Sequence, residues 1–484
     1  MKLRPPIDAR TRPAEMVVVK SKPAKSGDVD LPGHHHAGIR RLLWVYFWLL
    51  LIEGALRKWF LPGFANPLLV VRDPVVILIY FLALTGRIFP WNGFVIWSAI
   101  LFVLSAAASL TASGTNIYVT LYGLRTDFLF LPLIYIIPKV FDLNDVEKIG
   151  RWLLISTIPM ALLVALQFRS SPGAWINVGV GAAEGAQMAV GFGKIRPPGT
   201  FSFHSGLASY LGVVVAFLMS WLLRRGSITS LVALTSIPAA GLMIAVSGSR
   251  GVLTSFTVIM AGVAYVCLRK GVFFGKGVRA AVVIALAFFM LQLLSVVRQG
   301  MIVHEYRVTE GGGIRSGLID RVAHGFAEPF TAIKDTPLLG EGIGLGTTVA
   351  GGLMYGERRF LLAETEWLRV MKESGPIIGL AILALRVVIV VTIGLRARRA
   401  LDESANPLPM ILFAAIFPMA LNGQFGIATI LGFATFGAGL CLAAINEGHR
   451  ANENEPFRVS PDSVTNPSRI VRGRSVYAEK LHGR

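Results

Sequence analysis

Apolar stretches of about twenty residues follow one another along most of the chain, separated by short groups of Arg, Lys, Gly and Pro. A run of that length can cross a hydrocarbon core of ~30 Å as a single helix. Such runs can be drawn at about 42–61, 67–86, 92–112, 118–138, 152–168, 203–223, 228–247, 251–268, 280–297, 376–395, 407–423 and 427–446. The pattern predicts an all-α fold, a polytopic transmembrane bundle of about twelve spans within a domain over residues 40–446.

Basic residues gather at every second junction between these runs. The clusters are Arg40 and Arg41, Arg87, Lys139 with Lys148 and Arg151, Arg224 and Arg225, Arg269 with Lys270, Lys276 and Arg279, and Arg396 with Arg398 and Arg399. Loops that stay in the cytoplasm carry an excess of Lys and Arg, so these junctions are predicted to be cytoplasmic. Both termini are then cytoplasmic as well.

Two of the outer junctions are long, at about 169–202 and at about 298–375, the second lying between the ninth and tenth spans. Apolar residues recur at helical spacing from Ser316 to Ile333, which predicts an amphipathic helix on or near the membrane surface. The ends of the chain, residues 1–39 and 447–484, are polar and basic. We expect both to be disordered cytoplasmic tails that prefer anionic lipid.

The composition supports a membrane protein, because 54% of the residues are apolar and only 15% are charged. The net charge of +19, from 47 Lys and Arg against 28 Asp and Glu, would indicate nucleic-acid binding in a soluble protein. Here the basic residues set topology, and no nucleic-acid partner is expected. The two cysteines, Cys267 and Cys441, both lie within apolar runs and predict neither a disulfide nor a metal site.

Several charged residues fall in or at the ends of the early spans: Arg72 and Asp73, Arg125 and Asp127, and Glu53 with Arg57 and Lys58. A charge near hydrocarbon is costly and needs a partner or a function. Two interpretations are open. These residues form internal ion pairs that fix helix packing, or they contact a lipid-diphosphate ligand.

Four short segments fall on the outer face of the predicted topology. They are Arg196-Pro-Pro-Gly-Thr-Phe-Ser-Phe-His-Ser-Gly, Ser247-Gly-Ser-Arg-Gly251, Asp320-Arg321 followed by Pro337-Leu-Leu-Gly-Glu-Gly-Ile-Gly-Leu-Gly346, and Glu364-Thr-Glu-Trp-Leu-Arg-Val-Met-Lys-Glu-Ser-Gly375. They bring Arg196, Arg250 and Arg321 to one side of the membrane. A guanidinium binds phosphate oxygens in a bidentate way, and neighbouring Gly lets the backbone approach closely. These segments predict an anion site.

In content and order the segments resemble the O-antigen ligase and O-antigen polymerase superfamily of bacterial envelope glycosyltransferases, over roughly residues 190–390. The resemblance implies a type C glycosyltransferase-like fold in the bacterial inner membrane, with residues 298–375 as a long periplasmic loop. It implies an inverting transfer, without metal or other cofactor, from an undecaprenyl-diphosphate-linked oligosaccharide to a glycan or lipid acceptor. Membrane lipids and polysaccharide assembly proteins are the other expected partners.

The resemblance also implies roles for particular residues. Arg196 and Arg250 would hold the diphosphate as catalytic groups, and Arg321 would add positive charge from the loop. The remaining residues assigned to substrate binding are Thr200, His204, Ser249, Glu366 and Arg125. Fixed cations at the leaving oxygen would supply the main stabilisation as diphosphate departs.

The chain departs from the family pattern at Glu364-Thr365, where the family usually has His-Asn. Glu364 is a candidate general base for the acceptor hydroxyl, a brace for an arginine, or a sign that activity is changed or lost. Glu366 is a second candidate base. His204 is a third, although capping the sixth span is the preferred interpretation for this histidine.

Two other function classes remain open from sequence. One is a transporter or flippase for lipid-linked sugars, although transporters usually bind substrate near the bilayer midplane between repeated halves. The other is a catalytically silent scaffold of a polysaccharide assembly complex. Gathering of the arginines at one surface favours the enzyme.

Overall fold

The computed structural model describes residues 32–112, 116–224, 226, 228–310, 320–356, 361–363 and 365–446. Within these ranges the chain is mainly helical. The α-helices are α1 (Pro32–Ala55), α2 (Arg72–Thr85), α3 (Gly93–Thr111), α4 (Ile117–Leu124), α5 (Leu133–Val140), α6 (Leu143–Arg169), α7 (His204–Leu223), α8 (Ser230–Val246), α9 (Arg250–Arg269), α10 (Phe274–Leu291), α11 (Ser295–Glu310), α12 (Asp320–Thr331), α13 (Thr348–Tyr355), α14 (Glu366–Ser404), α15 (Leu408–Asn422) and α16 (Ala428–Ile445). Two short antiparallel strands, β1 (Ala189–Gly191) and β2 (Lys194–Ile195), form a hairpin before α7.

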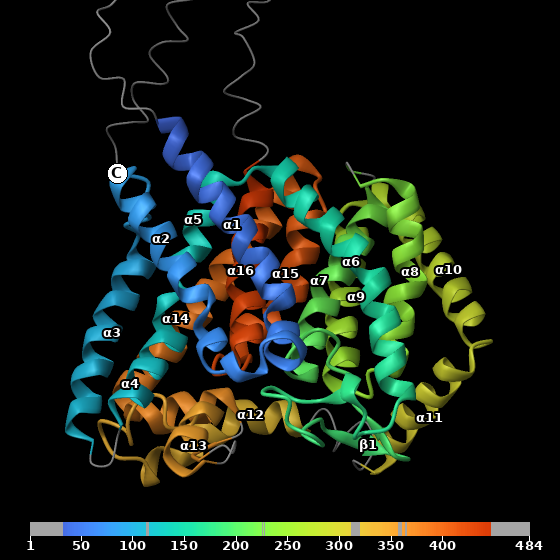
Figure 1. Cartoon of the computed structure of the whole chain (residues 1–484). Helices are drawn as coiled ribbons and strands as arrows, with labels where there is room; N and C mark the ends of the chain where they lie inside the picture. Colours follow the sequence, from blue (N-terminus) through green and yellow to red (C-terminus); the bar gives the residue numbers. More distant parts are fainter. Residues whose placement is uncertain are drawn as a thin grey trace, which may run out of the picture.

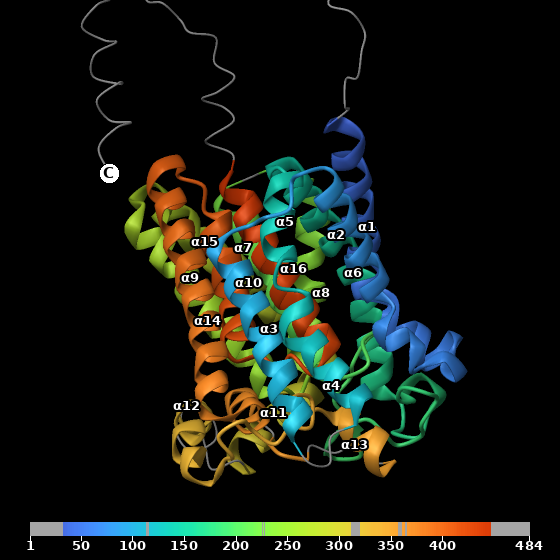
Figure 2. The same cartoon turned by 90° about the vertical axis from the view of Figure 1, so that its left-hand side faces the viewer.

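The helices form a bundle with two distinct ends (Figures 1 and 2). We call the end where α1 begins and α16 ends the upper end. The lower end holds α11, α12, α13 and the β-hairpin (Figure 1). Helices α7 and α16 are almost completely buried in the centre, whereas most residues of α2 and α10 face outward. The described parts of the segments that were predicted to lie on the outer face are therefore next to the lower ends of helices (Figure 1).

Eight helices in the described ranges are long and apolar enough to cross a membrane, and a ninth span results if α4 and α5, bent by 41°, count as one. This is the structure expected of a helical, multi-pass membrane protein. The predicted count of about twelve is not confirmed. Helices α8 and α15, with 17 and 15 residues, rise only about 22–26 Å at 1.5 Å per residue. Helix α1 carries Arg40, Arg41 and Glu53 along its apolar run.

The predicted amphipathic helix is confirmed over the described part of its range, as α12. Its Phe326 ring packs edge-to-face on Trp367 of α14, with centroids 4.8 Å apart. The N-terminal boundary of the bundle is earlier than predicted, because α1 begins at Pro32 and thus includes residues assigned to the tail. The remaining residues of both tails lie outside the described ranges.

Helix α14 is broken near its start, at Gly375, which has φ +74° and ψ 171°. The break allows the backbone of the large loop to approach, and Gly340, itself at φ +78°, lies directly against Gly375 and the Glu373 carbonyl. Loop and helix are also joined by the Gly342 amide, which donates to the Glu373 carbonyl over 3.1 Å. Residues 337–346 thus form one packed unit with α14.

We expect Gly340→Ala to lower the free energy of unfolding by roughly 1–3 kcal/mol, since a Cβ would enter the Glu373 backbone at a left-handed φ. Thermal unfolding of the detergent-purified protein, followed by size-exclusion chromatography, measures the change. Gly352→Ala in α13 is the control, because nothing lies within 4 Å of a Cβ there. Equal stability of the two variants would contradict the packed loop.

Candidate functional site

The segment that begins at Arg196 is fixed to the bundle by backbone and side-chain contacts. The Arg196 amide donates to the Met188 carbonyl over 2.8 Å, which continues the pairing of the β-hairpin. Further on, the Thr200 hydroxyl donates to the Leu51 carbonyl of α1 over 2.7 Å. Thr200 lines none of the cavities described below, so its hydroxyl anchors the segment and its assignment to substrate binding is not supported.

Two further hydrogen bonds fix the backbone of Gly199. Its amide donates to Gln167 Oε1 over 2.8 Å, and its carbonyl accepts from the buried Lys58 Nζ over 2.6 Å. A Cβ at this position would clash with Met160, and φ is +61°. Glycine is therefore required for the turn that places Arg196 near the N-terminal end of α7.

The second arginine stands at the first turn of α9. The turn before it contains Gly248 at φ +55°, where a Cβ would clash with Val190 of β1. This close contact places Ser249 and Arg250 beside the β-hairpin. The positive end of the α9 dipole adds to the charge of Arg250 at this point.

Arg196, His204, Ser249 and Arg250 line one cavity of about 450 Å³ at the lower end. Arg196 Nη1 lies 3.4 Å from His204 Nε2. The prediction that Arg196 and Arg250 converge is confirmed. Of the described residues that line the cavity, none is a carboxylate, so the arrangement suits an anion.

His204 does not cap α7. The N-cap is Phe203, no side chain caps this helix end, and the described polar contact of the imidazole is with Arg196. The capping interpretation is therefore wrong. His204 instead presents its ring to the cavity between the two arginine-bearing segments.

A third guanidinium, that of Arg307 in α11, also lines this cavity and was missed from sequence. Buried residues of α11 recur at Val297, Gly300 and His304, and Arg307 continues the same face at helical spacing. That face packs on α8, where His304 Nε2 lies 3.1 Å from the Ile244 carbonyl. Burial lowers the pKa of His304, which keeps the ring neutral at pH 7. The spacing was the signal that could have identified Arg307.

Two adjoining cavities extend the site. One, of about 490 Å³, runs from Arg250 past Thr365 and Glu366 toward α15. The other, of about 640 Å³, joins Arg196 and His204 to Thr365 and Gln424 beneath the 170–203 loop. Thr365 lines both and therefore lies between them. Glu364 itself is outside the described residues, and of Arg321 only the backbone is described, as the second residue of α12.

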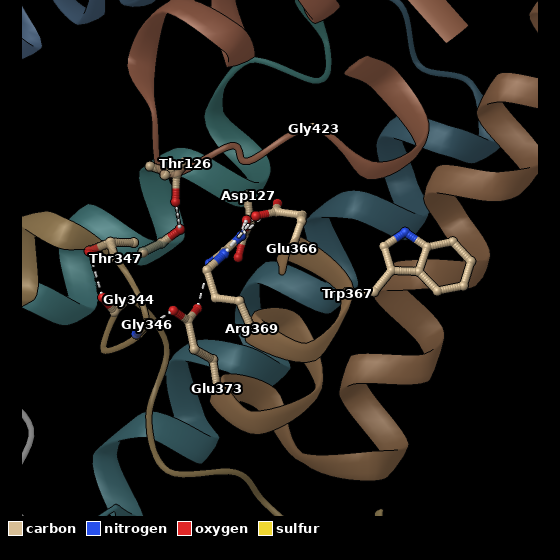
Figure 3. A network of polar contacts seen from close by, with 12 residues as sticks. Thr126, Asp127, Gly344, Gly346, Thr347, Glu366, Trp367, Arg369, Glu373 and Gly423 are labelled. Atoms are coloured by element: carbon tan, nitrogen blue, oxygen red, sulfur yellow. Dashed lines mark hydrogen bonds and ion pairs between the residues drawn. The ribbon is translucent and has the colours of Figure 1, made fainter. Parts of the chain in front are cut away.

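Glu366 lies at the edge of the site, but both carboxylate oxygens are already engaged (Figure 3). Arg369 donates to Oε2 and Oε1 over 2.9 Å each, and Arg386 Nη1 donates to Oε1 over 2.9 Å. The Glu366 side chain is fully buried. A carboxylate held by two guanidiniums is a poor proton acceptor, so Glu366 is a structural group and the hypothesis that it acts as a base or binds substrate is not supported.

Arg369 connects this glutamate to two further acidic residues from distant parts of the chain. Its Nη2 donates to Asp127 Oδ1 over 2.7 Å and its Nη1 to Glu373 Oε2 over 2.6 Å (Figure 3). The other Glu373 oxygen accepts the Gly346 amide over 2.7 Å. This buried network fixes the start of α14, the π-helical turn after α4 and the large loop to one another.

Apart from Lys58, which donates to the Gly199 carbonyl, the early charged residues form internal ion pairs, as one of the two interpretations predicted. Arg72 Nε donates to Glu53 Oε2 over 2.9 Å. The Arg125 guanidinium donates to both oxygens of Asp73, and its Nη2 lies 2.8 Å from Oδ1. Arg125 lines none of the three cavities. The assignment of Arg125 to substrate binding is therefore not supported, because its guanidinium pairs with Asp73 within the bundle.

In the part of the chain that the structure describes, no group of three or more His, Cys, Asp or Glu side chains is arranged to hold a metal ion. No protein-family model matches this chain, and no curated protein matches it either. The function must therefore be argued from the site.

Proposed function

We propose that this protein is a membrane glycosyltransferase of the O-antigen ligase and polymerase type. In this proposal it transfers a sugar chain from a lipid-linked diphosphate to an acceptor hydroxyl. The observation that carries the proposal is the cavity in which Arg196 and Arg250, 54 residues apart in sequence, meet with Arg307. A diphosphate is the anion whose charge and size suit three guanidiniums.

The proposed reaction builds negative charge on a departing group. The acceptor oxygen bonds to the anomeric carbon, the bond from that carbon to the diphosphate oxygen breaks with its electron pair, and the hydroxyl proton passes to a base. Arginines placed at the leaving oxygen stabilise the charge as it forms. Each guanidinium can donate two parallel hydrogen bonds to phosphate oxygens, which a single ammonium group cannot do.

The base in this proposal is Glu364. Its neighbour Thr365 lines both cavities that adjoin the arginines, which supports a place for this segment at the reaction centre. Glu366 is committed to Arg369 and Arg386. His204, beside Arg196, is better suited to bind an oxygen of the substrate than to accept a proton between cations.

The proposal includes an orientation: the lower end is periplasmic and both ends of the chain are cytoplasmic, in a bacterial inner membrane. Supporting this, the start of α1 and the end of α16 both lie at the upper end (Figure 1). Lys139 and Arg396 line a cavity at that same end. An excess of basic residues is typical of the cytoplasmic face.

Deletion of the gene, followed by analysis of lipid-linked and finished polysaccharide, tests the proposal. Accumulated single repeat units would indicate a polymerase, and long polymer left on its lipid carrier would indicate a ligase. In either case, the wild-type gene must restore the normal profile. An unchanged profile, or lipid-linked units trapped on the cytoplasmic face as expected for a lost flippase, would contradict a transferase.

Arg307→Gln should lower the rate of transfer by about tenfold, because one charge-assisted contact to the diphosphate is lost. In-vitro transfer from a purified lipid-diphosphate donor measures the effect. The matched control is Arg298→Gln, an exposed arginine of the same helix that lines none of the three cavities. Equal rates for the two variants would remove Arg307 from the site.

A further inference from the structure

A second polar cavity, of about 340 Å³, lies at the upper end of the bundle, far from the arginine cavity. Four helices meet around it: the start of α3, the end of α5, the C-terminal part of α14 and the end of α16. Its lining residues are Pro90, Trp91, Asn92, Tyr135, Pro138, Lys139, Arg396, Leu442, Ile445 and Asn446. They include two cations, and among these described residues there is no carboxylate.

Tyr135 presents a buried hydroxyl at this cavity. The side chain is 8% exposed, and among the described residues its hydroxyl has no hydrogen-bond partner. The ring is held in place by stacking on Phe94, with centroids 5.7 Å apart and an angle of 4° between planes. A buried hydroxyl without a partner is costly. An acceptor atom in the cavity would satisfy it.

Two of the other residues that line the cavity, Lys139 and Arg396, are cations. Lys139 uses one of its three N–H donors on the Ile88 carbonyl, at 3.0 Å. Arg396 lines the same cavity as Tyr135. Helix α3 begins here, with the Asn92 side chain as its N-cap, so the positive end of its dipole faces the same space.

We propose that this cavity binds a phosphate group. Tyr135, Lys139 and Arg396 would each donate to its oxygens, and no described carboxylate would repel it. Trp91, 70% exposed at the rim, is the kind of residue that lies at the headgroup level of a membrane. The phosphate is therefore that of an anionic phospholipid headgroup, and a soluble phosphate ester shares the same chemistry.

Native mass spectrometry of the detergent-purified full chain tests the proposal. It is titrated separately with phosphatidylglycerol, phosphatidylcholine, glycerol 3-phosphate and inorganic phosphate. We expect phosphatidylglycerol to bind at least about tenfold more tightly than phosphatidylcholine, whose choline cation would meet Lys139 and Arg396. Binding of the soluble phosphates with equal affinity would support a phosphate site whose ligand comes from solution. Equal affinity for the two lipids, without binding of the soluble phosphates, would overturn the proposal.

Variants assign the binding to this cavity. Arg396→Gln should weaken phosphatidylglycerol binding about tenfold and Tyr135→Phe about threefold. Arg399→Gln, an exposed cation of the same helix that does not line the cavity, should change binding less than about twofold. Arg396→Lys keeps the charge and should retain part of the affinity, which covers the case in which Arg396→Gln fails to fold. Equal loss in the Arg396→Gln and Arg399→Gln variants would place the lipid elsewhere.

Discussion

An Arg250→Lys variant will fold and reach the membrane in normal amounts, yet its rate in the proposed transfer reaction will be about 100-fold lower than that of the wild type. Lysine keeps the positive charge at the first turn of α9, but it loses the two parallel N–H donors that a guanidinium offers to phosphate oxygens. A loss of ~2–3 kcal/mol of transition-state stabilisation corresponds to that change in rate. Polymer formation in the deletion strain carrying the variant, and transfer in vitro, both measure it.

The control for Arg250→Lys is Arg298→Lys on the exposed face of α11, which should leave transfer unchanged. Membrane insertion is followed by a fluorescent fusion and by gel filtration, so that loss of protein is distinguished from loss of chemistry. Normal product from well-folded Arg250→Lys protein would contradict a bidentate role for this arginine. It would leave a role as a simple positive charge, which Arg250→Gln would then test.

Arg369→Met will destabilise the protein by about 3–5 kcal/mol, the range for breaking a buried ion pair by removing one partner. The substitution leaves Asp127 and Glu373 buried without a cation and takes two of the three donors from Glu366. Much less protein should be recovered after detergent extraction, and its unfolding temperature should fall. Thermal unfolding followed by gel filtration gives the comparison.

Two further variants make the Arg369 prediction specific. Arg269→Met removes an exposed arginine that pairs with Asp402 at 3.0 Å, and it should change stability little. Adding Asp127→Asn and Glu373→Gln to Arg369→Met removes the two stranded charges and should recover part of the lost stability. A stable single Arg369→Met variant would mean that the network is not essential for packing.

The sequence predicted the part of the site that depends on topology alone. Arg196 lies in the loop before one apolar run and Arg250 at the start of another, and alternation of spans predicted that both lie on one face. In the structure the two arginines line a common cavity. Arg307 was missed because its place depends on α11 packing against α8, which no charge pattern reveals, although the spacing of Val297 and His304 marks the buried face.

Pairing of buried charges could not be predicted, because it depends on contacts between distant segments. Asp127 stands beside Arg125 in sequence, yet its partner is Arg369, 242 positions away. Arg125 turns instead to Asp73 of α2. The same is true of Glu366: its sequence position suggested a base, but Arg369 and Arg386 hold its carboxylate.

The close contact between Gly340 and Gly375 divides the large loop into a part that is fixed and parts that are open to variation. Residues 337–346 are constrained by backbone contacts, so few substitutions are compatible with the fold there. Helices α12 and α13 on either side carry no such constraint on their outer faces. Over evolutionary time, mutations can therefore accumulate on the outer faces of α12 and α13 and change the surface around the site, while the helical bundle and residues 337–346 stay unchanged. A new specificity would then arise by drift in the flanking helices, without rebuilding the bundle.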